Sequence, residues 1–128
     1  MKTITVRQPW AWCLFHGKPV ENRDQIWPWN SHRGTIWIHA AKTCTKPEYR
    51  DAVDWIHHVI SPDFHVPPLE QLPLGMIVGK ADLIDVVRSH DSPWFCGTFG
   101  LVLANPKELV MPVPAKGALG WWEWEPKP

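Results

Sequence analysis

The chain has 128 residues, the size of one ordinary domain, and 45% of them are hydrophobic, which is enough to build a buried core. Thirteen basic side chains balance thirteen acidic ones, so the formal net charge is zero. This balance excludes the strongly basic surface of proteins that coat long phosphate backbones, and any contact with nucleic acid is expected to be local.

The first part of the chain predicts a strand, a helix and an extended segment. Lys2 to Val6 alternates polar and apolar residues as a short strand does. A helix is predicted from Pro9, a residue tolerated in a first turn, to Gly17, a residue that favours a helix end. Residues 18–23 then leave the helix in an extended form, and residues 24–33 are expected to form a loop.

The middle of the chain predicts a second strand and the best-defined helix. Residues 34–40, GTIWIHA, have the period of a strand. Thr45 and Glu48 form the capping-box pattern of a helix start. The helix that follows carries one apolar stripe with steps of three and four residues: Tyr49, Ala52, Val53, Ile56, Val59 and Ile60. Residues 61–73 contain four prolines and are predicted to be a loop.

The second half of the chain predicts four more strands. Residues 75–87 form a long strand with a bulge or bend near Gly79, and a loop covers residues 88–97. The remaining strands are residues 98–104, residues 108–113 after a turn at Asn105-Pro106, and residues 119–124. The pattern predicts one α+β domain over residues 1–128, a small mixed β-barrel of five to six strands with two main helices.

Cysteine usage and the chain start indicate the compartment. Cys13, Cys44 and Cys96 are far apart, with no CxxC pair, which predicts neither a disulfide framework nor structural zinc. Adjacent His57 and His58 do not change this, because neighbouring helix residues point about 100° apart. No apolar run approaches the roughly 18 residues of a membrane span, and no secretory signal begins the chain. We expect a cytoplasmic protein with no membrane contact, metal or cofactor.

Ten tryptophans are an unusual number for this length. Most are expected to fill the core, because indoles bury a large area. Eight lie beside Pro, Gly or charged residues in turn-like contexts, and some of these are expected to be half exposed, as stacking surfaces for bases: Trp10, Trp12, Trp27, Trp29, Trp94, Trp121, Trp122 and Trp124.

Polar side chains concentrate near the first helix and at the end of the second predicted strand. Arg7 beside a helix start suits an anion, and Lys18 and Arg23 add positive charge. Glu21 can accept a hydrogen bond from the amine of a base. On spacing alone, the favoured interpretation is a surface ion-pair cluster of little energetic value, with His39 as a partly buried structural histidine.

These stretches resemble the ASCH domain family. Gly17-Lys18-x-x-Glu21-x-Arg23 is similar to its G-x-K-x-x-E-x-R signature, although His16 takes the place of the usual glycine. Arg7-Gln8-Pro9-Trp10-Ala11 is similar to the R-Q-P-W/Y-A opening of bacterial and phage members. Further similar segments extend along most of the chain: Ile38-His39-Ala40, Leu74 to Gly79, Ser92-Pro93-Trp94-Phe95 and Leu103 to Pro106.

The resemblance implies a PUA-like barrel with a cleft beside the first helix, lined by the motif residues Lys18, Glu21 and Arg23. That superfamily includes RNA-binding domains and readers of modified bases. We expect the ligand-binding residues to be Arg7, Gln8, Trp10, Lys18, Glu21, Arg23, His39 and Lys42. Trp94 and Phe95 are candidates for a lid or a second stacking surface, or for a packed loop anchor.

Three functions are compatible with this site. The preferred one is a domain that binds RNA, single-stranded nucleic acid or a modified nucleoside without turnover. One branch of the family resembles an amidohydrolase of N4-acylcytidine, and there Lys18 would be the activating residue. Glu21 occupies the position of that branch's threonine nucleophile, so only attack by water remains open. A ribonuclease using Lys18, His39 or Tyr49 is the third alternative.

Overall fold

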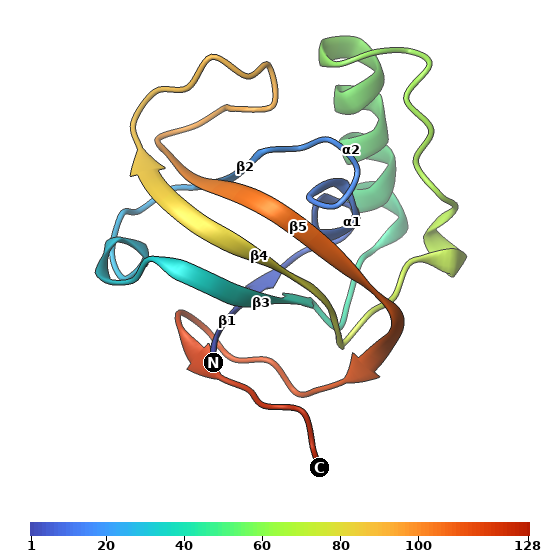
Figure 1. The fold of residues 1–128 in the computed structure, drawn as a ribbon. Helices are drawn as coiled ribbons and strands as arrows, with labels where there is room; N and C mark the ends of the chain where they lie inside the picture. The colour runs from blue at the N-terminus through green and yellow to red at the C-terminus, as the bar shows by residue number, and fades with distance from the viewer.

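The computed structural model describes residues 1–128 and is built on one mixed six-stranded sheet with the order β2-β5-β4-β3-β1-β6 (Figure 1). The strands are β1 (Lys2–Val6), β2 (Val20–Arg23), β3 (Gly34–Ala40), β4 (Met76–Val87), β5 (Phe99–Pro114) and β6 (Trp122–Glu123). The helices are α1 (Trp10–Cys13) and α2 (Lys46–Val59), with short 3₁₀ turns at Trp29–Ser31 and Leu69–Gln71.

The predicted α+β class, with six strands and two main helices, is confirmed. The sheet curves but does not close into a full barrel, because β2 and β6 are its two edges and do not pair with each other. Only β1 and β3 are parallel; the other neighbours are antiparallel. Neither helix has the length and apolar character needed to cross a membrane.

Alternating apolar residues of the four central strands form the main core. Their buried side chains include Ile4, Val6, Ile36, Ile38, Ala81, Leu83, Leu101 and Leu103. Full burial of a valine, leucine or isoleucine stabilises the fold by roughly 1.5–3 kcal/mol, so this core explains why the period-two segments pair as they do.

A second, smaller core joins the helices to the sheet. It contains Cys13 at the end of α1, Val20 at the start of β2, Ile56 of α2, Val66 and Trp94. Figure 1 shows α1 and α2 side by side at one end of the sheet. This core therefore fixes α1, α2 and β2 around a common space.

Helix α2 has the predicted start. The Thr45 hydroxyl accepts a hydrogen bond from the Glu48 N–H at 3.2 Å, and Glu48 Oε1 accepts one from the Thr45 N–H at 3.0 Å. Ala52 and Ile56 of the predicted stripe are buried, whereas Val59 at its end is exposed. The capping box is confirmed, and the stripe packs over most of its length.

Helix α1 is shorter than predicted. After Cys13 the hydrogen bonds tighten to a spacing of three residues, as in the 2.9 Å bond from the His16 N–H to Cys13 O. The Lys18 N–H then returns to the same oxygen at 3.0 Å, around Gly17 with φ of +108°. Gly17 ends the turn as predicted, but the helix itself ends earlier because the chain must direct Lys18 inward.

The predicted turn at Asn105-Pro106 is wrong, because β5 runs through it as one long strand. Asn105 and Pro106 both lie opposite Ala81, since Asp82 pairs with Ala104 and Lys80 pairs with Lys107. Asn105 has a left-handed φ of 53°, and its side chain donates to Asp82 at 3.0 Å. The dipeptide therefore forms a β-bulge, which inserts one extra residue without reversing the strand.

Two further expectations concern strand ends and bends. The bend near Gly79 is confirmed by register shifts next to it, and a Cβ there would lie 2.5 Å from Lys107 O and from the Phe15 ring. The last strand is shorter than predicted and covers only Trp122–Glu123, because Gly120 before it has φ of +67° and interrupts the extended backbone.

Candidate functional site

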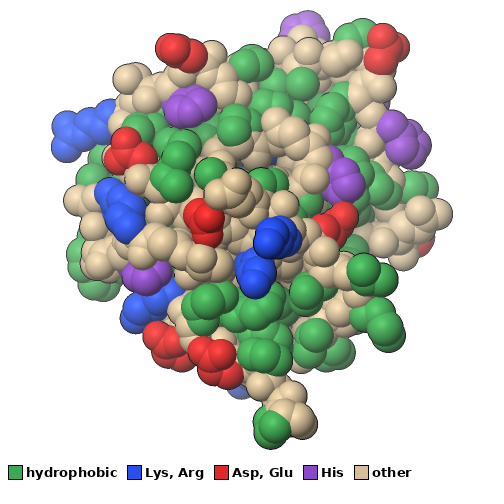
Figure 2. Space-filling view, viewed as in Figure 1, with side chains coloured by type: hydrophobic (Ala, Val, Ile, Leu, Met, Phe, Trp, Pro, Cys, Tyr) green, Lys and Arg blue, Asp and Glu red, His purple; other side chains and the backbone are tan.

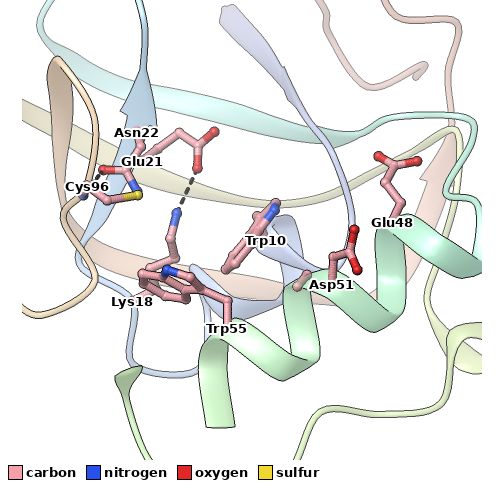
Figure 3. Close-up of a pocket in the computed structure, with 9 residues that line it drawn as sticks. Trp10, Lys18, Glu21, Asn22, Glu48, Asp51, Trp55 and Cys96 are labelled. Carbon is pink, nitrogen blue, oxygen red and sulfur yellow. Dashed lines mark hydrogen bonds and ion pairs between the residues drawn. The ribbon is translucent and has the colours of Figure 1, made fainter. Parts of the chain in front are cut away.

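A cleft of about 440 Å³ opens among β2, α1 and α2 (Figure 3). Nine residues from these elements and from the loop before β5 line it: Trp10, Lys18, Glu21, Asn22, Glu48, Asp51, Ala52, Trp55 and Cys96. Three of the predicted site residues, Trp10, Lys18 and Glu21, are among them.

A largely buried cluster of three charges lies at one wall of the cleft, which two of them, Lys18 and Glu21, line. Lys18 Nζ donates to Glu21 Oε1 at 2.9 Å, and these side chains are only 2% and 10% exposed. Arg23 Nη2 lies 3.2 Å from Glu21 Oε2, so a single carboxylate joins two cations. Glu21 and Arg23 are two apart on β2 and therefore share a face, while the turn after α1 supplies Lys18.

Arg23 is held firmly on its other side. Its Nη2 donates to Thr5 O at 3.0 Å, and its guanidinium lies 4.7 Å from the centre of the Trp29 ring. The orientation of the cluster is thus set by the backbone of β1 and by an aromatic face.

Lys18 retains hydrogen-bonding capacity toward the cleft. Its ammonium carries three N–H donors, and the one hydrogen bond that it makes within the chain goes to Glu21. The Trp10 ring, 5.4 Å from Nζ, provides an additional electrostatic contact. Because the group is buried, an acceptor that enters the cleft would gain a strong, charge-assisted hydrogen bond there.

Two indoles form the apolar part of the cleft. The Trp10 and Trp55 ring centres lie 5.7 Å apart with an angle of 79° between their planes. Figure 3 shows both rings beside the Lys18 side chain. A flat ligand can therefore stack on one indole and meet the edge of the other, but it cannot be sandwiched between the two.

Helix α2 contributes two carboxylates to the cleft, one in an ion pair and one without. Arg7 approaches Glu48 with both Nε and Nη2, the latter 2.8 Å from Oε1. These hydrogen bonds, assisted by the Thr45 N–H, lower the pKa of Glu48 to about 2. Asp51, one turn along the helix, is exposed and forms no ion pair, so it remains a free acceptor at the cleft.

Asn22 fastens the loop that forms the remaining wall. Its Nδ2 donates to Trp94 O at 3.0 Å, and its Oδ1 accepts from the Cys96 N–H at 3.1 Å. The exposed Cys96 thiol lies at the rim. Strand β2 and this loop are therefore joined by side-chain hydrogen bonds.

Other predicted site residues lie outside the cleft, and Gln8 and His39 have hydrogen-bond partners of their own. Gln8 is buried, with its Nε2 donating to Pro73 O at 3.0 Å and its Oε1 accepting from the Trp12 N–H at 2.9 Å. His39 is also buried; its Nε2 lies 2.7 Å from Ala115 O, and burial lowers its pKa. Lys42 is exposed beside Gly75.

The two candidates for a lid are packed rather than free. Trp94 is buried against Phe64, with ring centres 5.4 Å apart, and against Trp55 at 6.2 Å. Phe95 is half-buried against the backbone of Gly100. Trp94 therefore supports the wall of the cleft through its contact with Trp55.

Sequence reasoning missed the contribution of α2. Glu48, Ala52 and Trp55 follow each other in steps of four and three, with Asp51 beside Ala52, so they share one helix face. This face lies beside the apolar stripe, and its spacing was the signal available in the sequence.

Comparison with known proteins gives two informative similarities. No protein-family model matches the chain. Activating signal cointegrator 1 of Homo sapiens is 30% identical over 97% of the chain, and the Mus musculus protein of the same name is 28% identical over 97%. The chain covers 22% of each of them, so it spans about a fifth of the length of the curated relatives it matches.

Proposed function

We propose that this chain is an ASCH-type domain that binds a nucleobase of RNA, of single-stranded nucleic acid or of a modified nucleoside in the cleft among β2, α1 and α2. The observation that carries the proposal is the buried cluster of Lys18, Glu21 and Arg23, since these residues also carry the resemblance to the family. The similarity to activating signal cointegrator 1 along nearly the whole chain supports a common domain and is not extended to the activity of those longer proteins.

The charges around the cleft favour a heterocycle over a phosphate. Arg7, Lys18 and Arg23 are balanced by three carboxylates of Glu21, Glu48 and Asp51. On the face shown in Figure 2, basic and acidic side chains are interspersed, without a continuous basic track. Affinity is therefore expected from stacking, about 1–3 kcal/mol per base, and from a few hydrogen bonds.

The polar groups favour particular bases. Lys18 can donate to a carbonyl oxygen, and Asp51 can accept from an exocyclic amine, while an indole of Trp10 or Trp55 supports the ring. Cytosine and guanine carry both a carbonyl and an amine, whereas uracil lacks the amine and adenine lacks the carbonyl.

The test is a titration of the protein with the four nucleosides, in which tryptophan fluorescence and calorimetry measure binding. We expect cytidine and guanosine to bind more tightly than uridine and adenosine, and Lys18→Met and Trp10→Ala to weaken binding at least tenfold. Lys107→Met, an exposed lysine outside the cleft, is the matched control and should bind normally. Flat titrations with all nucleosides, RNA and single-stranded DNA would refute the proposal.

A hydrolase of acylated cytidine is the second candidate, supported by the buried contact between Lys18 and Glu21. Both Glu21 oxygens already contact cations, however, which leaves the carboxylate poorly placed to take a proton from water. No Ser or Thr lines the cleft, and Cys96 is its only thiol. We expect incubation with N4-acetylcytidine to release no cytidine. Release that Lys18→Ala and Glu21→Gln both abolish would replace the binding proposal with the hydrolase.

The ribonuclease alternative has less support. The Tyr49 hydroxyl donates to Pro67 O at 2.5 Å, and His39 is bound to Ala115 O. Neither residue lines the cleft, so an acid–base pair with Lys18 is not assembled there.

A further inference from the structure

A second hollow, of about 800 Å³, lies on the far side of Arg23. It is formed by the loop after β2 and the segment before β6, and its lining includes Arg23, Trp27, Trp29 and Trp121. The proposed function of the cleft makes no use of it.

Arg23 lines the hollow and contacts a residue that lines the cleft. Its Nη2 lies 3.2 Å from Glu21 Oε2, which is in the cleft, while its guanidinium covers Trp29 and lines the hollow. The Nε of the same side chain is buried without a hydrogen-bond partner. The ion pair of Arg23 with Glu21 therefore links the two spaces, because Glu21 lines the cleft and Arg23 lines the hollow.

The hollow has a fixed floor and a free aromatic surface. Trp29 and Trp121 pack edge to face with centres 5.2 Å apart, and Trp121 Nε1 donates to Pro28 O at 3.0 Å. Trp27, by contrast, is 78% exposed, although an indole is among the largest apolar groups in proteins. An exposed indole beside a concave surface is a platform on which any base can stack.

We propose that the hollow holds a second nucleotide, stacked on Trp27, whose neighbour in the same strand occupies the cleft. Arg23 lies between the two positions and neutralises the linking phosphate, which suits its planar, always charged guanidinium. Asp24 makes the hollow itself neutral, so it suits a base and not another phosphate. The ligand is then a single strand of at least two nucleotides; paired bases of a duplex cannot stack on the indole. This inference rests on the proposed function of the cleft.

The test compares cytidine with a cytidine tetranucleotide on the full chain by calorimetry. We expect the tetranucleotide to bind at least tenfold more tightly than cytidine. Trp27→Ala should weaken tetranucleotide binding by about 5-fold to 150-fold, the effect of losing one stacked base, and leave cytidine binding unchanged. Trp124→Ala, a tryptophan outside both spaces, is the matched control and should change neither affinity.

The salt dependence provides an independent readout. One neutralised phosphate predicts that log K for the tetranucleotide falls by about 0.7 per unit of log salt concentration, and that the cytidine value stays constant. A slope of about 2 or more would mean that several phosphates are bound, which contradicts the proposed position of Arg23.

The remaining outcomes are also decisive. Equal affinities for cytidine and tetranucleotide, or normal tetranucleotide binding by Trp27→Ala, overturn the second site and leave the cleft proposal intact. Equal weakening of both ligands by Trp27→Ala shows a general structural effect and also overturns it. If neither ligand binds the unmodified chain, the proposed function fails and this inference fails with it. Displacement of the tetranucleotide by a duplex of the same length would contradict the stacking of an unpaired base.

Discussion

Glu21→Gln removes the carboxylate that joins Lys18 and Arg23 without changing the size of the side chain. In the unmodified chain the Lys18 side chain is 2% exposed and that of Arg23 is 21% exposed. The substitution therefore leaves a buried ammonium beside a largely buried guanidinium, with a neutral amide between them. Removal of one partner from a buried ion pair costs about 3–5 kcal/mol. At about 4 °C per kcal/mol for a domain of this size, Tm should fall by roughly 12–20 °C.

Lys18→Met is the comparison that isolates the cause. Methionine has a similar length, and Glu21 keeps its contact with Arg23 at 3.2 Å. The substitution also removes the desolvation cost of the ammonium, so we expect the free energy of unfolding to fall by less than about 1.5 kcal/mol. Binding of cytidine should nevertheless weaken at least tenfold, because the donor in the cleft is gone. Glu21→Gln should therefore be the less stable of the two variants. It keeps the Lys18 donor, however, so it should bind cytidine more tightly than Lys18→Met does.

Urea unfolding followed by tryptophan fluorescence and by far-ultraviolet circular dichroism measures both free energies. Addition of 1 M salt should restore little of the stability of Glu21→Gln, because buried charges are weakly screened. A loss below about 1 kcal/mol in Glu21→Gln, or an equal loss in Lys18→Met, would refute the reasoning that the buried charges depend on Glu21.

Three further outcomes are expected. Hydrogen bonds from Arg7 hold the pKa of Glu48 at about 2, below its ordinary 4.5. This pair therefore stabilises the fold above pH 4.5, and the stabilisation is lost as the pH falls toward 2. The difference in unfolding free energy between the unmodified chain and Glu48→Gln, measured with urea, should shrink over that interval. Iodoacetamide at pH 8 should modify the exposed Cys96 quickly and spare Cys13, because burial raises the pKa of the Cys13 thiol to about 12. Bound cytidine should slow the reaction of Cys96, as followed by mass spectrometry. Gly79→Ala should lower the free energy of unfolding by about 1–3 kcal/mol in thermal or urea unfolding, because the added Cβ has no space.

The sequence predicted those parts of the fold whose signals are local. The capping box of Thr45 and Glu48 is such a signal, and it marked the start of α2 correctly. Asn105-Pro106 is not, because a left-handed asparagine followed by proline suits a turn and a bulge equally. The pairing with β4 decides between them, and that partner lies more than twenty residues away along the chain. The end of α1 was missed for the same reason, since the inward position of Lys18 depends on Glu21 of the next strand.

Recognition of the site was limited by a different ambiguity. Lys18 and Glu21 were found because the motif holds them three residues apart. Gln8 and His39 were equally good candidates in the sequence, but in the structure their side chains form hydrogen bonds with backbone carbonyl groups. A polar residue in an apolar segment satisfies a buried backbone group or binds a ligand, and only the tertiary contacts distinguish the two. Trp55 was not predicted because it lies on α2, outside the motifs that identified Lys18 and Glu21.

The hydrogen bonds of Asn22 to the backbone at Trp94 and Cys96 have a kinetic consequence. They set the width of the entrance before any ligand arrives, so association does not wait for a segment to close and loses little loop entropy. Weak ligands should then exchange rapidly, and nuclear magnetic resonance signals of the bound and free forms should merge into averaged peaks.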